Sequence, residues 1–279
     1  MILRCAQFDL TLTRPHVMGI VNVTPDSFSD GGKFTHTSAA VEHALDLLRQ
    51  GADILDIGGE STRPNATPVS LQEELDRVIP VIEALAGKIS VPISIDTYKP
   101  EVMAAAIQAG ASMVNDVRAL QEIGALEAVA KCDVGVCLMH MQGTPQTMQV
   151  NPMYEDVVQE VKAFLAERVA ACMAAGMSKD RIVLDPGFGF GKTRAHNILL
   201  IQELAALQSL GYPLLVGLSR KSVLGQVTGQ DVEARLHASV AAAVISAMKG
   251  AKIVRVHDVK ATVEALKVVA AIDEQQQDN

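Results

Sequence analysis

The sequence predicts an α/β protein built as a single (β/α)8 barrel, the TIM-barrel architecture. Short β-rich runs alternate with Ala-rich helical runs along the whole 279-residue chain. The strand-like runs are almost continuously apolar, which is typical of a parallel sheet covered by helices on both faces. About eight such units in a chain near the usual ~250 residues favour a barrel. An open doubly wound sheet is the alternative, although no dinucleotide fingerprint follows the first strand.

The expected strands are short segments rich in Val, Ile and Leu. In chain order they are Val17–Asn22, Asp53–Gly58, Ile93–Asp96, Met113–Asp116, Val134–His140, Ile182–Asp185, Leu214–Leu218 and Ile253–Val256. Most of these strands are followed by a helix-like run, so neighbouring strands are expected to run parallel.

Amphipathic runs between the strands predict the helices. They cover residues 38–50, 70–86, 100–109, 154–175, 197–210, 232–248 and 259–271. Ser38 and Ser70 are candidate N-caps, and Pro100 suits a first helical turn. Glycines stand where C-terminal caps belong, at Gly51, Gly110, Gly176, Gly211 and Gly250. The polar end, residues 273–279, is expected to fray.

Composition excludes several classes of protein. Hydrophobic residues make up 49% of the chain, which excludes intrinsic disorder. Apolar runs stay shorter than the roughly 18–20 residues of a membrane helix, and charges interrupt the N-terminal segment as they would not in a secretory signal. The four cysteines lack zinc-like spacing, which favours reduced thiols and a cytoplasmic location. The net charge of −8 argues against nucleic acid as the main partner. We expect one domain over residues 1–279.

Polar residues collect at the carboxyl ends of the expected strands. In a barrel these ends meet on one face, where the active sites of such barrels lie. They include Asn22, Thr62, Arg63, Asp96, Asn115, His140, Asp185, Lys221, Arg255 and His257. A single strand-end Asp could be a helix cap, but so many polar ends together indicate a binding site.

The chemistry of these side chains suggests their ligand. Asp96, Asn115 and Asp185 suit the N–H groups of a guanidine-like heterocycle edge, where each charge-assisted hydrogen bond contributes about 1.5–3 kcal/mol. The basic residues suit a phosphate or carboxylate, unless they are simply solvated at the surface; they are Arg63, Arg220, Lys221, Arg255 and His257. Asn22, with Asp56 near it, offers oxygen for Mg²⁺ shared with substrate phosphates.

Two further patterns look like ligand-binding motifs but are not interpreted as such. The segment 187–193 looks like a phosphate loop, but Pro186 stands where the Walker spacing needs Gly, so ATP binding is rejected. Cys132 and Cys137 are interpreted as small core residues. Phe28 and Phe190, in Gly-rich stretches, indicate either a stacking surface for a planar ligand or packing on the core.

The sequence closely resembles the bacterial dihydropteroate synthase family. The resemblance rests on motifs that follow one another in the family's order across essentially the whole chain. They are Val21–Gly32, Asp56–Pro64, Ser94–Thr97, Val114–Asp116, Leu138–Met141, Asp185–Gly191, Gly217–Ser222 and Arg255–Val259.

The resemblance implies a transferase of folate biosynthesis that is a homodimer of TIM barrels. It would join 6-hydroxymethyl-7,8-dihydropterin diphosphate to p-aminobenzoate with the help of Mg²⁺. The products would be 7,8-dihydropteroate and pyrophosphate, and sulfonamides would compete with p-aminobenzoate.

The resemblance also implies a role for individual residues. The pterin would contact Asp96, Asn115, Met139, Asp185 and Lys221. The diphosphate would contact Asn22, Arg255 and His257, with Asn22 on the metal. The p-aminobenzoate site would include Phe28, Thr62, Arg63, Pro64, Phe190 and Ser222. The catalytic set would be Asp96, Asp185, Lys221, Arg255 and His257.

We expect a dissociative, ordered mechanism in which pyrophosphate orders the loops at 22–34 and 60–67. Two alternatives stay open, a pterin-binding methyltransferase and a catalytically silent pterin-binding protein. The diphosphate residues argue against the first, and the presence of Asn22, Thr62, Arg63 and Lys221 argues against the second. The role of His140, a rim histidine or a ligand contact, is left open.

Overall fold

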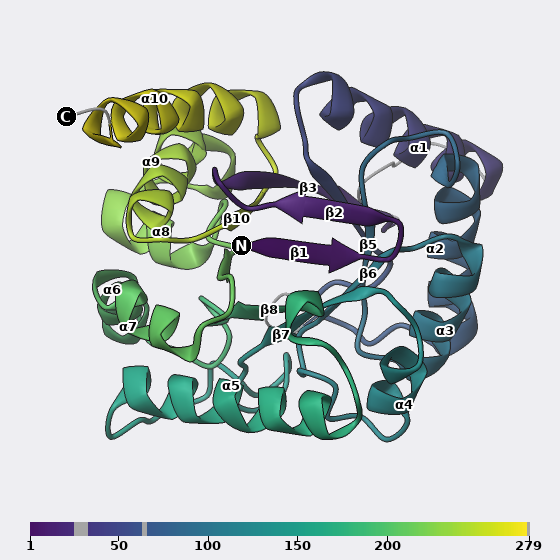
Figure 1. Cartoon of the computed structure of the whole chain (residues 1–279), viewed down its shortest axis with the longest axis horizontal. Coiled ribbons are helices and arrows are strands. Elements are labelled where there is room, and N and C mark those ends of the chain that lie inside the picture. The colour runs from purple at the N-terminus through teal and green to yellow at the C-terminus, as the bar shows by residue number, and fades with distance from the viewer. Residues whose placement is uncertain (25–32, 63–65, 278–279) are drawn as a thin grey trace.

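Eight parallel strands form a closed barrel in the computed structural model, which describes residues 1–24, 33–62 and 66–277 (Figure 1). The strands are β3 His16–Asn22, β4 Ile54–Gly58, β5 Ile93–Asp96, β6 Met113–Asp116, β7 Gly135–Met139, β8 Ile182–Asp185, β9 Leu215–Val216 and β10 Ile253–Val256. They pair in the order β8-β7-β6-β5-β4-β3-β10-β9. A single parallel bridge between Leu184 and Leu214 joins the two edges of this sheet. The predicted (β/α)8 barrel is therefore confirmed.

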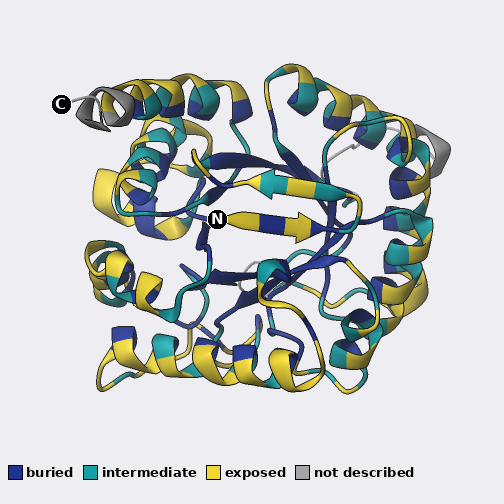
Figure 2. Ribbon diagram, in the orientation of Figure 1, coloured by how far each residue is buried: buried dark blue, intermediate teal, exposed yellow. Residues whose placement is uncertain are grey.

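Helices surround the barrel and cover its outer face (Figure 1). They are α1 Lys33–Arg49, α2 Leu71–Leu85, α3 Pro100–Ala109, α4 Ala125–Ala130, α5 Val157–Ala174, α6 Arg194–Gln202, α7 Leu204–Leu207, α8 Ser222–Thr228, α9 Leu236–Met248 and α10 Val259–Gln277. Figure 2 shows buried strands and helices with buried inner and exposed outer faces, as amphipathic helices on a barrel require.

The helix ends follow the predicted signals, with one exception. The Ser70 hydroxyl accepts the N–H of Glu73 at 3.2 Å, and Pro100 begins α3. All five predicted cap glycines have positive φ, from 77° at Gly211 to 115° at Gly110. The prediction for Ser38 was wrong, because α1 begins at Lys33 and Ser38 lies inside it. Ser is only a moderately poor helix former, so a helix passes through it at small cost.

Several other boundaries differ from the predicted ones. The expected helix over 197–210 is divided into α6, α7 and a 3₁₀ turn. A capping box formed by Thr193 and His196 makes α6 begin at Arg194, three residues earlier than expected. Strand β9 has only two residues. Helix α10 runs to Gln277, so helical backbone extends into the end that was expected to fray.

A β-hairpin that the sequence analysis did not predict lies across the amino-terminal end of the barrel (Figure 1). It consists of β1 Ile2–Cys5 and β2 Phe8–Thr11. Leu3 and Cys5 are fully buried and pack on the inward side chains of the barrel strands, including Cys137. Strand β7 needs a glycine at its first position, because a Cβ on Gly135 would lie 2.7 Å from the Cys5 sulfur. The hairpin closes one end of the barrel.

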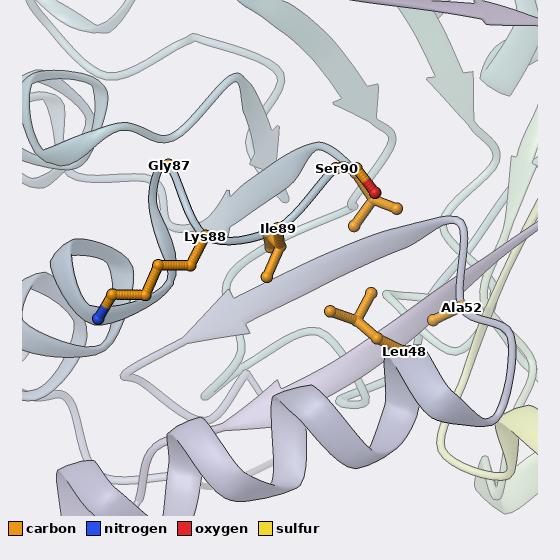
Figure 3. Close-up of a pocket in the computed structure, with 7 residues that line it drawn as sticks. Leu48, Ala52, Gly87, Lys88, Ile89 and Ser90 are labelled. Carbon is orange, nitrogen blue, oxygen red and sulfur yellow. The ribbon is translucent and has the colours of Figure 1, made fainter.

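The same end of the molecule holds a cavity of about 530 Å³ (Figure 3). It is lined by Leu48 in the last turn of α1, by Ala52 between α1 and β4, and by residues 87–91, which precede β5. These residues lie before their strands, whereas the polar strand ends lie after them, so this cavity is not part of the polar site. In the described ranges, no helix is both long and apolar enough to cross a membrane.

Candidate functional site

Strand register brings the predicted polar residues together at the carboxyl ends of the strands. Asn22 on β3 pairs in register with Gly58, which pairs with Asp96, and Asp96 pairs with Asn115. On the next strands, Met139 pairs with Asp185. The barrel therefore places two amides, two carboxylates and a thioether around one rim.

A buried ionic network joins this rim across the barrel. The Arg255 Nε atom donates to Asp56 Oδ2 at 2.5 Å, and its Nη2 atom donates to Asp96 Oδ2 at 2.7 Å. Asn115 Nδ2 donates to the same Asp56 oxygen at 3.1 Å. Burial lowers the pKa of Arg255, but the carboxylates of Asp56 and Asp96 outweigh this and raise it. The guanidinium is therefore a permanent cation that fixes both carboxylates.

The two predicted carboxylates carry perturbed pKa values. Burial raises the pKa of Asp96 to about 7, with Arg255 opposing the shift and Asp56 adding to it. Burial also raises the pKa of Asp185, against the attraction of Lys221. One Asp185 oxygen accepts the Gly187 N–H at 2.7 Å. A ligand that brings N–H donors or positive charge would relieve the cost of these buried carboxylates.

Lys221 supplies a cation beside Asp185. It directly precedes α8, and its Nζ atom donates to the carbonyl oxygen of Phe188 at 2.5 Å. The same atom lies 4.6 Å from the centre of the Phe190 ring. Burial lowers the pKa of Lys221 to about 8, and Asp185 opposes the shift. The side chain therefore stays mostly protonated at neutral pH.

The predicted anion-binding residues lie along β10 and beyond it. Arg255 and His257 are two residues apart, which places their side chains on one side of an extended chain. The His257 Nδ1 atom lies 3.0 Å from the Ser219 hydroxyl, which also accepts the His257 backbone N–H at 3.2 Å. Ser219 thus orients the His257 ring. Arg220 does not join this group, because its guanidinium pairs with Asp258 through bonds of 3.0 and 2.5 Å.

A magnesium ion fits this site only as a partner of a bound phosphate. Asn22, half-buried at the end of β3, offers one amide oxygen. Asp56, which lies on the neighbouring strand β4 opposite Ile20, is held by Arg255 and Asn115 through its Oδ2 atom. Across residues 1–24, 33–62 and 66–277, no three His, Cys, Asp or Glu side chains gather as a metal site. One protein oxygen and several phosphate oxygens is a common way to hold Mg²⁺.

The residues expected around p-aminobenzoate are only partly placed. Thr62 is half-buried after β4, Phe190 lies after β8, and Ser222 is exposed as the first residue of α8. Lys221 brings the last two near each other, since it adjoins Ser222 in sequence and contacts the Phe190 ring. Phe28, Arg63 and Pro64 lie outside the described residues, as do most of the loops at 22–34 and 60–67.

Sequence reasoning did not assign the roles of three residues that organise the site, and it named Asp56 only as an oxygen near the expected magnesium ion. Asp56 and Ser219 hold Arg255 and His257, and Lys192 contacts His140 through Nζ and Nδ1 at 2.9 Å. Burial lowers the pKa of Lys192 below its usual range, with Asp185 opposing. A charged residue inside an apolar strand run, as Asp56 is, could have signalled a buried partner. Phe188, by contrast, is fully buried and belongs to the core.

Comparison with known proteins identifies the family of this chain. The sequence pattern of the family described as "Pterin binding enzyme" matches residues 18–257. Dihydropteroate synthase of Escherichia coli strain K12 is 55% identical over 262 residues, which are 94% of this chain and 93% of that protein.

Solved structures give the same result. The Yersinia pestis dihydropteroate synthase in complex with a sulfonamide drug superposes with a TM-score of 0.93 at 52% identity, covering 98% of this chain and all (100%) of that one. The Xanthomonas albilineans enzyme with 4-aminobenzoic acid gives 0.92 at 56% identity, and with 7,8-dihydropteroate 0.90 at 53%. Both comparisons cover 98% of this chain and 98–99% of the other. The chain therefore belongs to the pterin-binding enzyme family and, within it, to the dihydropteroate synthases.

Proposed function

We propose that this chain joins 6-hydroxymethyl-7,8-dihydropterin diphosphate to p-aminobenzoate and releases 7,8-dihydropteroate and pyrophosphate. The observation that carries the proposal is the buried network of Arg255, Asp56, Asp96 and Asn115, with Asp185 and Lys221 beside it. This set combines acceptors for a heterocycle edge with cations for its anionic tail. Both halves are needed for a pterin that carries a diphosphate.

The pterin is assigned to the Asp185 side of the rim. Asp96 and Asp185 accept its ring N–H groups, and Asn115 and Lys221 add polar contacts. Met139, which is buried beside Asp185, packs on the flat ring. The raised pKa values of Asp96 and Asp185 support this assignment, because each carboxylate gains stability when a donor arrives.

The chemical step breaks the bond between the pterin methylene carbon and the diphosphate oxygen, whose electron pair leaves with pyrophosphate. The positive charge on the methylene carbon spreads into the pterin ring, where Asp96 and Asp185 stabilise it. Arg255 and His257 stabilise the negative charge of the leaving pyrophosphate. Asn22 would help to hold Mg²⁺, which would supply further positive charge to that group when bound.

The amine of p-aminobenzoate then forms the new carbon–nitrogen bond and loses a proton to solvent. An aromatic amine is already nucleophilic when neutral, so the site needs to position it more than to deprotonate it. Phe28, Thr62, Arg63, Pro64, Phe190 and Ser222 are assigned to this second subsite, where sulfonamides would compete. Bound pyrophosphate is proposed to complete the subsite, so that p-aminobenzoate binds second.

Pyrophosphate release tests the proposed reaction. The purified protein is mixed with dihydropterin diphosphate, p-aminobenzoate and Mg²⁺, and each is omitted in turn. We expect release only in the full mixture, with a loss of at least about 100-fold in kcat/KM for Lys221→Ala and Arg255→Ala. Pterin binding without release would favour a silent binding protein or a methyltransferase. Tight p-aminobenzoate binding in the absence of pyrophosphate would disprove the ordered mechanism.

We further propose that the enzyme acts as a cytoplasmic homodimer that associates through α9 and α10. Large apolar side chains on these helices are exposed, with Met248 71%, Val268 60% and Ile272 56% accessible. They line a groove of about 320 Å³ whose walls are Val244, Met248, Ala265, Val268, Val269 and Ile272. Sedimentation of Val268→Glu tests this: the variant should be monomeric where the unmodified protein is dimeric.

A further inference from the structure

Lys192 is a lysine buried at the end of the segment that follows β8. Its exposed fraction is 2%, although lysine is almost never buried without partners. The Nζ atom lies 2.9 Å from His140 Nδ1, 2.9 Å from the Gly187 carbonyl oxygen and 3.0 Å from that of Phe190. These three acceptors match the three N–H donors of an ammonium group, and the His140 carbonyl oxygen lies farther from Nζ, at 3.5 Å. The segment between 187 and 190 is therefore wrapped around a positive charge.

His140 provides the acceptor from outside the segment. Burial lowers the pKa of Lys192 well below its usual range, but the two carbonyl oxygens at its Nζ atom and the charge of Asp185 favour the ammonium form. Because an ammonium group can only donate, the His140 Nδ1 atom accepts and the ring proton is assigned to Nε2. Burial and the charge of Lys192 lower the pKa of His140 to about 3, which agrees with a neutral ring. The ring packs edge-on against Phe164 at 5.0 Å between centroids. Because His140 directly follows β7, its bond ties the end of β7 to the segment after β8.

Backbone carbonyl groups of this segment accept hydrogen bonds from two different lysines, Lys192 and Lys221. The carbonyl groups of Gly187 and Phe190 turn towards Lys192, whereas that of Phe188 accepts from Lys221 at 2.5 Å. Positive φ angles of 70° at Gly187, 81° at Gly189 and 63° at Gly191 make this backbone path possible. A shift of the carbonyl groups that contact Lys192 would therefore also move the Phe188 oxygen and the Phe190 ring, which contact Lys221.

We propose that Lys192, with His140, is a positioning residue for the reaction. Its ammonium group holds residues 187–190 in the conformation that places the Phe188 oxygen and the Phe190 ring against Lys221. Lys221 is thereby fixed where the pterin binds. Lys192 acts through Lys221 and not on the substrate. The inference rests on the proposed synthase function, because synthase activity reports the placement of Lys221.

A double-mutant cycle tests this coupling. Lys192→Met keeps the length of the side chain and removes its ammonium group. We expect kcat/KM for dihydropterin diphosphate, measured by pyrophosphate release, to fall about 30-fold. In the Lys221→Met background the same substitution should lower it by less than about 3-fold, because the residue through which it acts is gone. A contribution to folding alone would give the same factor in both backgrounds.

Lys179→Met is the matched control. Lys179 is exposed and lies in the turn before β8, at the opposite end of the same strand. Its removal should leave kcat/KM unchanged. Circular dichroism and the thermal midpoint of each variant show whether it is folded.

A second pair of variants serves if Lys192→Met does not fold. His140→Leu removes the acceptor, whereas His140→Asn places an amide oxygen at the position of Nδ1. We expect about a 10-fold loss of kcat/KM in the first variant and recovery to within about 3-fold of the unmodified enzyme in the second.

The outcomes separate this inference from the proposed function. An unmodified protein without turnover would overturn the proposed function. If the unmodified protein turns over, the positioning role is overturned by an unchanged Lys192→Met variant or by fully additive losses in the cycle. Equal activity of the two His140 variants would also overturn it.

Discussion

Lys221 is a cation whose charge depends on pH near neutrality. Because its pKa is lowered to about 8, it loses its proton as the pH rises through that value. Asp96, whose pKa is raised to about 7, loses its charge as the pH falls through that value. We therefore expect a narrow bell-shaped profile of kcat/KM with its maximum between these two values, as measured by initial rates.

The alkaline limb of that profile identifies its residue. In Lys221→Arg the side chain stays charged at high pH, so the decline above about pH 8 should disappear even though kcat/KM is lower throughout. An unchanged alkaline limb in this variant would assign the titration to another group.

Asp56 is a buried carboxylate that holds Arg255, and its charge should matter more than its size. Asp56→Asn keeps the shape of the side chain but leaves the guanidinium partly unpaired. We expect a loss of about 3–5 kcal/mol in the free energy of unfolding and at least a 10-fold drop in kcat/KM. Urea unfolding and initial rates measure the two effects.

Asp53→Asn is the control at the other end of β4. Asp53 pairs with Arg14, whose side chain is 55% exposed, and accepts the Val17 N–H at 2.8 Å. The Asn oxygen can still accept that N–H, so the substitution should cost only about 1 kcal/mol and leave kcat/KM unchanged. If both variants behave alike, the Asp56–Arg255 pair has no special role.

Single residues also show what the sequence could and could not predict. Asp96, Asn115, Asp185 and Arg255 were identified as strand-end residues, because a parallel barrel gathers those ends whatever the details of packing. The pairing of Arg255 with Asp56 joins residues 199 positions apart. Local patterns contain no information about such a contact, which depends on the closure of the barrel.

At the scale of elements, the segment after β8 depends on its glycines. A Cβ on Gly187 would lie 1.8 Å from the His140 carbonyl oxygen, at a φ of +70°. Gly176, after α5, has a similar φ of +89° but open space around it. Gly176→Ala should therefore cost only the backbone strain, about 1–2 kcal/mol.

Gly187→Ala should cost several kcal/mol more, because the segment must move away from β7. It should also lower kcat/KM, since the Phe190 ring moves with the segment. Urea unfolding and initial rates of both variants check this, and equal losses of stability would contradict the crowding at Gly187.

Elements were predictable where apolar runs are bounded by clear turns. The bounds of β5, β6, β8 and β10 agree with the predicted ones. The β1–β2 hairpin was missed because its strands have only four residues each and its turn has Ala6 at φ 52° in place of glycine. Helix α4, with six residues, is too short to show a helical period.

At the scale of the whole molecule, the hairpin stabilises the barrel without taking part in the chemistry. Leu3 is fully buried beneath it, whereas the neighbouring Ile2 is 49% exposed. Leu3→Ala should lower the free energy of unfolding by about 2–5 kcal/mol, and Ile2→Ala by less than about 1 kcal/mol.

At a temperature where both variants are folded, kcat should equal that of the unmodified enzyme, because the hairpin and the active site lie at opposite ends of the barrel. A fall in kcat that follows the loss of stability would show that the two ends are coupled.

The closure of the barrel has a consequence for ligand binding. The ring of strands is joined between β8 and β9 by one bridge, Leu184 to Leu214, so backbone amides at this junction should open before those of β4. Asp185 and Lys221, the proposed pterin residues, stand on its two sides. A bound pterin would span the junction with its own hydrogen bonds. Deuterium uptake at 214–218 should therefore be fast in the free enzyme and should slow most strongly when the pterin binds, because the substrate links the two sides of the junction.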